Sequence, residues 1–513
     1  MNGAEALART LLASGIDLCF ANPGTSEMHF VSALDRVPGL RCVLGLAETV
    51  VTGCADGYAR MAGKPAATLL HCGPGFANGI ANLHNAKRAC TPIVNVMGDH
   101  ATWHRPFDSP LTSDTEGLAR SVSGWVRTCR DAHDVGRDAA AAVQAARTPP
   151  GQVATLILPA DCAWNDGGEV ATAPPPPART AVTPQIVADI AMALRRGERA
   201  MLLLAGEALG ERGLVAANRV AQAANVELRV PTQVARLARG RGRVPIDRIP
   251  YPVDAALKVL AGTRHLVLAG ARAPVAFFGY PGKPSQLWPT ECTVHMLARV
   301  EEDIVAALEA LAEALGAPPS ATIPGAGPRP EVRKGPFEPV AFGHTLAALL
   351  PENAVIAEDA VTSGRGLFPV TWAAAPHDWI QITGGAIGHA FPAATGAALG
   401  APGRKVVCLQ ADGGGMYSLQ SLWTQARERL DVVNVVFANR RYAILQGELA
   451  AVGAQPGPAS KALFDLSRPT LDWVMLANGM GVEARRVATL EVFADVFAAA
   501  CARPGPFLIE MVV

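Results

Sequence analysis

Asp412 and Asn439 each follow an apolar run near the end of the chain, and together they could hold a metal ion. Asp412 comes just after the run Lys405–Gln410, and Asn439 comes directly after the run Val432–Ala438. If both runs are parallel strands, their carboxyl ends meet at one edge of a sheet. Two side-chain oxygens and a nearby backbone carbonyl are the hard ligands that octahedral Mg²⁺ prefers. The alternative is structural, with an Asp-Gly turn and an asparagine cap.

Three glycines after Asp412 could bind a phosphate group beside that metal. Gly413, Gly414 and Gly415 precede a helix that we predict over Tyr417–Arg429. Glycines let backbone N–H groups approach an anion closely, and a helix N-terminus favours negative charge. The stretch therefore predicts an anion site next to the metal ligands.

Glu48 stands between two apolar stretches near the other end of the chain. It closes the run Cys42–Ala47, which predicts a buried strand, and opens the small-residue run Thr49–Ala55, which predicts a packed helix. A carboxylate is rarely buried without a partner or a task. The structural alternative is a glutamate that faces the helix macrodipole.

The composition argues against several classes of protein. Lys plus Arg and Asp plus Glu both number 45 in 513 residues, so the charge balance predicts neither a nucleic-acid partner nor an anionic membrane partner. No run of 18 apolar residues predicts a membrane span, and Met1–Ala6 lacks the basic segment of a signal peptide. The ten cysteines form no C-x-x-C pair, which predicts reduced thiols in a cytoplasmic protein without a zinc site.

Two proline-rich stretches, 173–178 and 316–336, divide the chain into three predicted domains over residues 1–165, 180–315 and 335–513. In each domain short apolar runs alternate with helical patterns. That alternation predicts an α/β fold with three doubly wound parallel sheets. The predicted strands are Asp17–Ala21, Cys42–Ala47, Ala66–Leu70, Ile93–Met97, Val153–Leu158, Met201–Ala205, Val226–Val230, His265–Ala269, Ala354–Ala357, Trp379–Thr383, Lys405–Gln410, Val432–Ala438 and Phe507–Val512.

The Asp-Gly pair followed at this distance by Asn439 resembles the thiamine diphosphate motif of 2-oxoacid decarboxylases and acetolactate synthases. That motif reads G-D-G and N-N, and here Ala411 and Ala438 replace two of its residues. Both metal-binding side chains are present. The resemblance implies that Asp412, Asn439 and the carbonyl of Arg441 hold Mg²⁺, with thiamine diphosphate as the cofactor.

The resemblance extends to the N-terminal part and gives Glu48 a task. Family members carry a glutamate before a helix similar to Ala55–Arg60, and its carboxyl exchanges a proton with the pyrimidine ring of the cofactor. Leu70–Asn78 resembles the G-P-G-x-x-N segment, in which the benzoylformate decarboxylase branch places a histidine at the position of His71. That histidine handles protons on the substrate. The structural alternative is a strand-end histidine with a backbone partner.

The loop Asn22–Glu27 resembles the N-P-G-S loop of the same branch, where a hydroxyl meets the substrate carboxylate. Thr25 matches that hydroxyl and Ser26 is its neighbour. In the C-terminal part, Thr383–Gly388 resembles the loop that bends the cofactor. The resemblance there implies that the cofactor is contacted by Asp359, Thr362, Gly385, Ile387, Gly413, Gly414 and Tyr442, and that the substrate pocket includes Thr25, Ser26, His71, Ile444, Leu445 and Glu448.

Two departures from the family pattern leave the substrate open. The segment Gly270–Tyr280 resembles a loop that carries a second histidine in benzoylformate decarboxylase, but it has none here. Acetolactate synthases place a glutamine around Asp108–Gly117, and that segment has no glutamine. The pairs Phe277-Phe278 and Ile444-Leu445 favour an uncharged or aromatic substituent on the substrate.

We therefore predict an enzyme that cleaves or forms a carbon–carbon bond next to a carbonyl, by 2-oxoacid decarboxylation, acyloin carboligation or both, as in acetolactate synthases. An enzyme on aromatic substrates, similar to benzoylformate decarboxylase or benzaldehyde lyase, is the alternative. A non-catalytic relative and a flavin- or nicotinamide-linked protein are the competing classes, and no G-x-G-x-x-G follows a first strand. The family implies a homodimer at minimum, with tetramers common, and leaves a structural FAD open though not expected.

Overall fold

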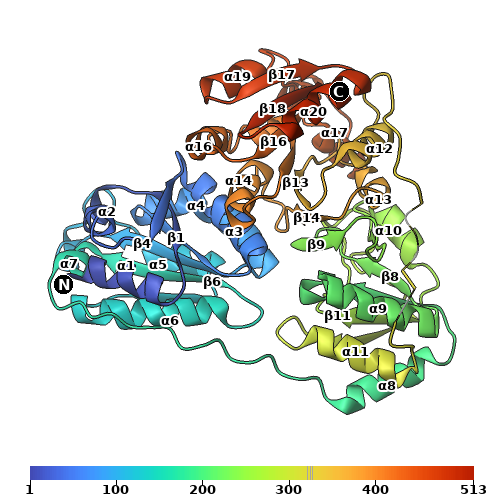
Figure 1. Ribbon diagram of the computed structural model, residues 1–513, viewed down its shortest axis with the longest axis horizontal. Coiled ribbons are helices and arrows are strands. Elements are labelled where there is room, and N and C mark those ends of the chain that lie inside the picture. The colour runs from blue at the N-terminus through green and yellow to red at the C-terminus, as the bar shows by residue number, and fades with distance from the viewer. Residues whose placement is uncertain (321, 324, 326) are drawn as a thin grey trace.

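The computed structural model describes residues 1–320, 322–323, 325 and 327–513, so Ala321, Pro324 and Ala326 of the second proline-rich stretch lie outside the described residues. Its strands form three separate sheets, one in each third of the chain (Figure 1). Every pairing within the first two sheets is parallel, and the third has one antiparallel edge. The predicted α/β class with doubly wound parallel sheets is confirmed.

The first sheet has six strands in the order β2-β1-β3-β4-β6-β5. One face packs on α1, α2, α6 and α7, and the other packs on α3, α4 and α5. The order reverses between β1 and β3, and ligands of open α/β sheets bind at such a point. The elements are β1 Leu18–Asn22, β2 Arg41–Leu44, β3 Ala66–Leu70, β4 Ile93–Asp99, β5 Trp125–Thr128, β6 Val153–Pro159, α1 Gly3–Ala13, α2 Met28–Leu34, α3 Glu48–Ala62, α4 Cys72–Ala89, α5 Thr115–Val122, α6 Val135–Arg147 and α7 Ala160–Trp164.

The second sheet has five strands in the order β10-β8-β7-β11-β12. It lies at the lower right of Figure 1, at the end of a long connection from the first sheet. Its central strands β7 and β11 are fully buried. The elements are β7 Ala200–Leu204, β8 Glu227–Val230, β10 Asp247–Arg248, β11 His265–Ala269, β12 Thr293–Ala298, α8 Pro184–Leu194, α9 Glu211–Ala224, α10 Val253–Leu260 and α11 Ile304–Ala314.

The third sheet has seven strands in the order β17-β18-β16-β15-β13-β14-β9. Here the order reverses between β13 and β15, so the ends of these two strands mark a second predicted ligand crevice. The elements are β13 Ala354–Asp359, β14 His377–Gln381, β15 Val406–Ala411, β16 Val432–Ala438, β17 Glu483–Val487, β18 Phe507–Val512, α12 Pro339–Leu349, α13 Leu367–Thr371, α14 Ala390–Gly400, α15 Asp412–Gly415, α16 Ser421–Glu428, α17 Ala443–Ala451, α18 Pro458–Phe464, α19 Trp473–Gly479 and α20 Leu490–Ala502.

The strand β9 (Arg236–Arg239) joins two parts of the chain. It belongs to the middle third but pairs antiparallel with β14 at the edge of the third sheet. An ion pair between Arg236 Nε and Asp378 Oδ1, 3.0 Å apart, supports that pairing. The predicted domain boundaries take no account of this exchange and stay a prediction.

The helices α3 and α14 hold the first and third parts together at the centre of Figure 1. Glycines line their contact: a Cβ on Gly57 would lie 2.1 Å from the carbonyl oxygen of Ala393, and one on Gly396 would lie 1.8 Å from that of Cys54. Only glycine lets the two backbones approach this closely. The two helices therefore fix how the parts are oriented.

Several predicted strand ends are shifted by one or two residues, and two predicted elements differ in ways that affect the site. The helix predicted over Tyr417–Arg429 begins only at Ser421 and ends at Glu428, because Tyr417 and Ser418 turn back to hydrogen-bond Gly414 and Gly415. The strand predicted over Cys42–Ala47 ends at Leu44. Beyond it Leu46 is exposed, so Glu48 begins its helix at an accessible edge and is only half-buried.

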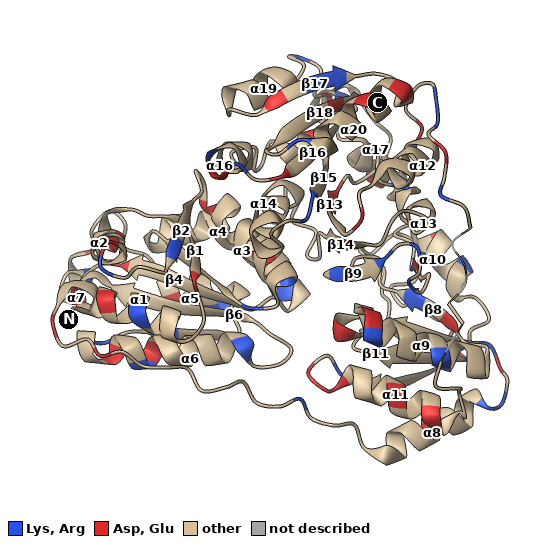
Figure 2. Cartoon of the chain, in the orientation of Figure 1, with Lys and Arg blue, Asp and Glu red and all other residues tan. Residues whose placement is uncertain are grey.

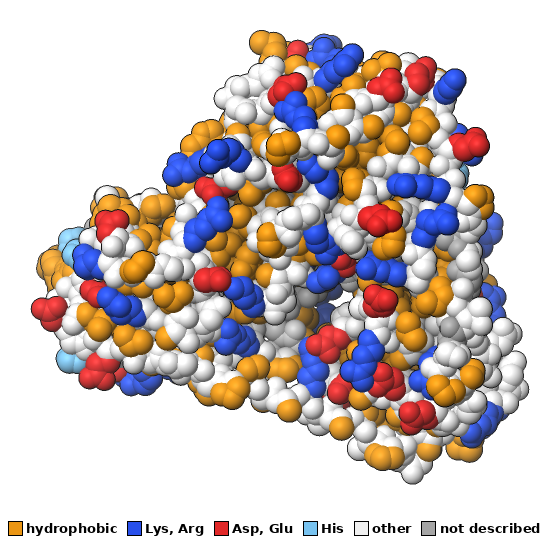
Figure 3. Space-filling view, viewed as in Figure 1, with side chains coloured by type: hydrophobic (Ala, Val, Ile, Leu, Met, Phe, Trp, Pro, Cys, Tyr) orange, Lys and Arg blue, Asp and Glu red, His pale blue; other side chains and the backbone are white. Residues whose placement is uncertain are grey.

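Charges of both signs are spread over all three parts of the chain (Figure 2). On the face in Figure 3 they alternate with hydrophobic side chains and form no stripe of one sign. None of the helices in the described part of the chain combines the length and the apolar character that crossing a membrane requires.

Candidate active site

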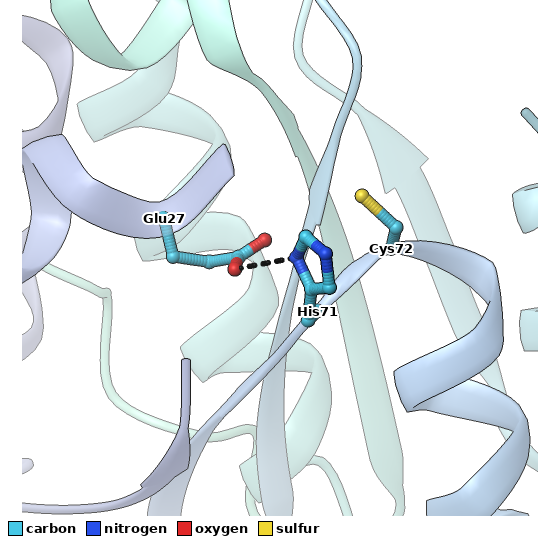
Figure 4. A group of neighbouring side chains, drawn as sticks. All are labelled: Glu27, His71 and Cys72. Carbon is cyan, nitrogen blue, oxygen red and sulfur yellow. Dashed lines mark hydrogen bonds and ion pairs between the residues drawn. The ribbon is translucent and has the colours of Figure 1, made fainter. Parts of the chain in front are cut away.

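Glu27 and His71 form an acid–base pair at the switch point of the first sheet (Figure 4). His71 follows β3 and precedes α4, and its Nδ1 lies 2.9 Å from Glu27 Oε2. Glu27 is buried, and its Oε2 also accepts the N–H of Gly24 at 2.7 Å. A carboxylate can only accept, so Nδ1–H donates and leaves Nε2 of the ring for other partners.

Glu27 is not among the site residues predicted from the sequence. The available signal was an acidic residue directly after the N-P-G-T-S loop, in a stretch that continues with Met28 and Phe30. The space for its side chain comes from a glycine on β4, because a Cβ on Gly98 would lie 1.6 Å from Glu27 Oε1. Contacts of this kind between distant segments cannot be derived from local sequence.

Of the two predicted hydroxyl residues, the structure brings Ser26 to the histidine. Ser26 Oγ lies 3.2 Å from His71 Nδ1, 2.8 Å from Glu27 Oε1 and 3.0 Å from Cys72 Sγ. Thr25 lies on the same turn but is exposed. Burial raises the pKa of the Cys72 thiol to about 11, so this sulfur is protonated at neutral pH. The Ser26 hydroxyl occupies the centre of the group.

Glu48 lies next to this pair. It is the first residue of α3, and its Oε2 accepts a hydrogen bond of 3.2 Å from Asn78 Nδ2 on α4. A Cβ on Gly75 would lie 3.0 Å from Glu48 Oε1 and 3.2 Å from His71 Cβ. The G-P-G segment therefore keeps Glu48 and His71 on either side of Gly75.

Asp412 begins α15 at the carboxyl end of β15 and is buried. Its Oδ1 accepts the N–H of Gly413 at 2.8 Å, and its Oδ2 accepts the N–H of Arg440 at 2.7 Å. Burial raises the pKa of this carboxyl above its ordinary value. The side chain is thus fixed by the loop that follows β16, next to Asn439.

Asn439 and Arg441 lie in that loop. Asn439 Oδ1 accepts the N–H of Arg441 at 3.0 Å, and the Arg441 carbonyl accepts the N–H of Ala443 at 3.0 Å. Beside the loop is an open pocket of about 400 Å³ whose lining includes Asn439 and four cationic side chains, Arg440, Arg441, Lys461 and Arg468. The three predicted metal ligands thus lie within one loop system at the end of two adjacent strands.

The predicted cofactor loop Thr383–Gly388 packs directly on the turn around Asp412. A Cβ on Gly388 would lie 2.9 Å from the carbonyl oxygen of Gly414, and Ser418 Oγ donates to the Gly388 carbonyl at 2.5 Å. Gly385 adopts the left-handed conformation, with φ +78. The two segments that the resemblance assigns to the cofactor are therefore in contact.

Asp359 is turned toward the backbone of this loop. Its Oδ2 accepts the N–H groups of Gly388 at 2.7 Å and His389 at 3.1 Å, while Oδ1 is buried without a hydrogen-bond partner. Burial raises the pKa of Asp359 to about 7, although these N–H donors oppose the shift. Its role in binding the cofactor stays a prediction, since the contacts that the structure gives it are structural.

The remaining predicted residues surround the same edge of the third sheet. The Tyr442 ring packs against Gly413, because a Cβ on Gly413 would lie 2.4 Å from Tyr442 Cε1. Thr362 is half-buried in the turns after β13. Of the others, Ile387 and Leu445 are exposed, and Ile444 and Glu448 are half-buried.

Glu48 and the cofactor loop Thr383–Gly388 are held by different residues of α4. The Gly384–Ala386 loop is held by Asn85, whose Nδ2 donates to the Ala386 carbonyl at 2.9 Å. Glu48 is held by Asn78, which also lies on α4. Asn78 comes seven residues before Asn85, a separation of about 10 Å along the helix axis. Among the described residues, no hydrogen bond or ion pair joins Glu48 or His71 to Asp412.

Two models of one family match the two halves. The N-terminal thiamine pyrophosphate binding domain matches residues 1–119, and the C-terminal thiamine pyrophosphate binding domain matches residues 362–511. IlvX of Mycobacterium tuberculosis, whose name assigns it provisionally to the acetolactate synthase large subunits, is 51% identical over 100% of this chain and 99% of its own. The chain belongs to the thiamine pyrophosphate enzyme family.

Further relatives and structures agree with this assignment. Benzoylformate decarboxylase of Pseudomonas aeruginosa is 28% identical over 97% of this chain and 96% of its own. The structure of a 4-hydroxybenzoylformate decarboxylase from Rhodococcus jostii RHA1 has a TM-score of 0.84 at 23% identity, covering 99% of this chain and 98% of its own. The structure of benzoylformate decarboxylase from Polynucleobacter necessarius has a TM-score of 0.83 at 23% identity, covering 100% of this chain and 99% of its own. These two structures show the fold alone.

The membership confirms the predicted cofactor and reaction class. The protein is a thiamine diphosphate enzyme, and its relatives support a reaction at the carbon–carbon bond next to a carbonyl. The roles of the individual residues stay predictions.

The environment of Asp412 fits the divalent cation that such a cofactor needs. The carboxyl is buried, its pKa is raised by burial, and no Lys or Arg of the described chain forms an ion pair with it. A divalent cation would supply the missing charge. The oxygens of Asp412, Asn439 and Arg441 are the hard donors that Mg²⁺ prefers.

Proposed function

We propose that this enzyme removes carbon dioxide from a 2-oxo acid and then either releases the aldehyde or joins the acyl unit to a second carbonyl compound. The observation that carries the proposal is the Glu27–His71 pair, 2.9 Å long, beside Glu48 at the switch point of the first sheet. A histidine with one nitrogen held by a buried carboxylate has its other nitrogen oriented for proton transfer.

Each half of the site has its own task in this proposal. Thiamine diphosphate, when bound, supplies a nucleophilic carbon and an electron sink for the cleavage. Asp412, Asn439 and Arg441 would hold Mg²⁺ at its phosphate end. Glu48, oriented by Asn78, would exchange the proton that activates the cofactor. His71 would move a proton at the substrate oxygen or at the carbon left after cleavage.

Ligation of two carbonyl compounds is the second outcome, supported by the 51% identical relative that is named for acetolactate synthesis. Decarboxylation without ligation is supported by the 28% identical benzoylformate decarboxylase, in which an aromatic oxo acid is the named substrate. The first chemical step is shared by both outcomes. The fate of the acyl unit distinguishes them.

We also propose a homodimer as the smallest active unit. Near the metal loop, Ile387, Tyr417 and Leu445 expose 36%, 55% and 42% of their surface, which is unusual for apolar side chains beside an active site. The N-terminal half of a second chain would cover them and bring its Glu48 to this edge. A tetramer and a cytoplasmic location, the latter supported by ten unbridged cysteines, belong to the same proposal.

A substrate panel tests the proposed reaction. The protein is loaded with Mg²⁺ and thiamine diphosphate, given pyruvate, benzoylformate, longer 2-oxo acids, or benzaldehyde, and assayed for released carbon dioxide and for acyloin. Carbon dioxide from a 2-oxo acid supports the proposal, and acyloin in addition supports ligation. No carbon dioxide from any of them, in protein that binds the cofactor, would contradict it.

A further inference from the structure

Glu448 is a carboxylate near the predicted cofactor loop that forms no ion pair within the described chain. It lies on α17, which begins four residues after Asn439. Tyr251 Oη donates to its Oε1 at 3.1 Å, and Tyr280 Oη donates to its Oε2 at 2.7 Å. Both tyrosines come from the middle part of the chain, on either side of β11. The two phenols donate hydrogen bonds to the carboxylate without neutralising its charge.

Aromatic rings connect this carboxylate to the cofactor loop. The Tyr251 and Phe277 rings are 5.3 Å apart, and the Phe277 and Phe278 rings are 5.2 Å apart. A Cβ on Gly385 would lie 3.0 Å from Phe277 Cζ. The group Tyr251, Phe277, Phe278, Tyr280 and Glu448, which we call the distal group, thus extends outward from Gly385.

The chemistry of the distal group selects for positive charge. Aromatic faces attract cations, and a carboxylate adds a direct hydrogen-bond acceptor for an ammonium or a guanidinium group. Each carboxylate oxygen accepts one tyrosine hydroxyl and retains capacity for another donor. An uncharged or aryl substituent would leave this carboxylate without a positively charged partner.

The geometry points to a substrate whose end remote from the oxo acid carries a cationic guanidinium or ammonium group, recognised by Glu448 within the distal group. This rests on the proposed function, because it places the substrate on the same edge as the cofactor loop. It replaces the uncharged or aromatic substituent that the sequence favoured from Phe277-Phe278 and Ile444-Leu445. The second histidine of the benzoylformate decarboxylase loop is absent here, and Tyr280 closes the corresponding segment.

The test compares two 2-oxo acids of similar length, 5-guanidino-2-oxopentanoate and 2-oxooctanoate, using the loaded enzyme. The measured quantity is the ratio of their kcat/KM values. We expect the ratio to favour the guanidino acid by about 10–100-fold, the usual worth of a hydrogen bond to a charged group. Glu448→Gln should bring the ratio close to one. A wild-type ratio at or below one would overturn the inference.

Two matched variants separate recognition from a structural contact between the parts. Tyr251→Phe and Tyr280→Phe keep the rings and the Glu448 charge but remove the hydroxyl contacts. If Glu448 recognises a cation, both should keep a ratio well above one. If Glu448 serves only to join α17 to the middle part, then Glu448→Gln, Tyr251→Phe and Tyr280→Phe should all change the ratio of kcat/KM values to the same extent. That result would show the inference to be wrong.

A binding measurement keeps this result independent of turnover. Calorimetry of the loaded enzyme with arginine and with norleucine, neither of which can be decarboxylated as an oxo acid, reports recognition of the side chain alone. Binding of arginine that Glu448→Gln weakens about tenfold or more supports the inference even if no 2-oxo acid is turned over. Equal binding of both amino acids by both proteins would contradict it.

Discussion

At the scale of single residues, His71 can move protons only if one ring nitrogen is held and the other is free. Glu27 provides that hold, since its Oε2 lies 2.9 Å from Nδ1 and the carboxylate itself is fixed by Gly24 and Ser26. A carboxylate behind a working imidazole fixes its tautomer and orientation. Glu27 is thus a positioning residue in the proposed reaction.

We expect Glu27→Gln to lower kcat about 10–100-fold, the usual effect of losing such a partner, while the affinity for thiamine diphosphate stays close to that of the wild type. His71→Ala should lower kcat at least as far. Because both changes disable one unit, the double variant should be no slower than His71→Ala. Steady-state kinetics of the four proteins measures this, and multiplicative losses would mean that the two residues act separately.

Asp412 gives a second prediction at this scale. Asp412→Ala should abolish retention of thiamine diphosphate, because it removes an anionic Mg²⁺ ligand at the cofactor's phosphate end. Calorimetry with Mg²⁺ and the cofactor measures the loss. Since burial raises the pKa of this carboxyl, wild-type affinity should begin to fall on acidification at a higher pH than an exposed aspartate would give. Unchanged affinity in Asp412→Ala would place the metal elsewhere.

Part of this site could be predicted from the sequence, because its signals are local. Asp412, Asn439 and the glycines between them follow apolar runs, and parallel strands place such residues at one edge. Glu27 gives no comparable signal, and Glu448 is placed in the substrate pocket by the resemblance without any indication of its partners. Their partners, His71 for one and Tyr251 and Tyr280 for the other, are 44, 197 and 168 residues away, and only the folded chain brings them together.

At the scale of elements, prediction from the sequence fails at turns and at the edge strands of the sheets. The long apolar strands β3, β11, β16 and β18 were predicted residue for residue. The short edge strands β5 and β17 show only weak alternation of apolar and polar residues and are not predicted. The strand β9 pairs with β14 of another sheet, a tertiary contact that local sequence does not indicate. The start of the helix after Asp412 was wrong because the Thr383–Gly388 loop holds Ser418 outside it.

The contact between α3 and α14 gives a prediction for these elements. Gly57→Ala places a methyl group where the backbone of Ala393 lies, with 2.1 Å to its carbonyl oxygen, so the helices must separate. We expect a loss of about 1–3 kcal/mol in the free energy of unfolding, as overpacking usually costs, measured by urea unfolding.

Gly447→Ala is the matched control for Gly57→Ala. A Cβ on Gly447 would meet nothing within 4 Å, and the residue lies within α17. Alanine should there be neutral or stabilising by about 0.5–1 kcal/mol, since it is the better helix former. Equal destabilisation by both substitutions would show that the glycines between α3 and α14 have no special role.

At the scale of the whole molecule, one chain carries both halves of the site, and among the described residues no hydrogen bond or ion pair joins Glu48 to Asp412. Asn78 and Asn85 lie about 10 Å apart on α4, and one holds Glu48 while the other holds the cofactor loop. Ile387, Tyr417 and Leu445 are exposed in the single chain. In the proposed dimer, a complete site would combine Glu48 from one protomer with Asp412 from its partner.

Mixing two inactive variants tests this arrangement. Glu48→Gln alone should bind the cofactor yet lose turnover by about 10²–10⁴-fold, because the amide cannot exchange the activating proton. Asp412→Ala alone should be inactive because it retains no cofactor. In a mixed dimer, one site combines both substitutions and the other combines the intact Glu48 of one chain with the intact Asp412 of the other. If the two chains are co-expressed in equal amounts and assort at random, half of the dimers are mixed and each has one intact site, so about a quarter of the wild-type kcat per chain should return. If each chain built its own site, no mixture of the two variants would regain activity, and the proposed dimer would have to be given up.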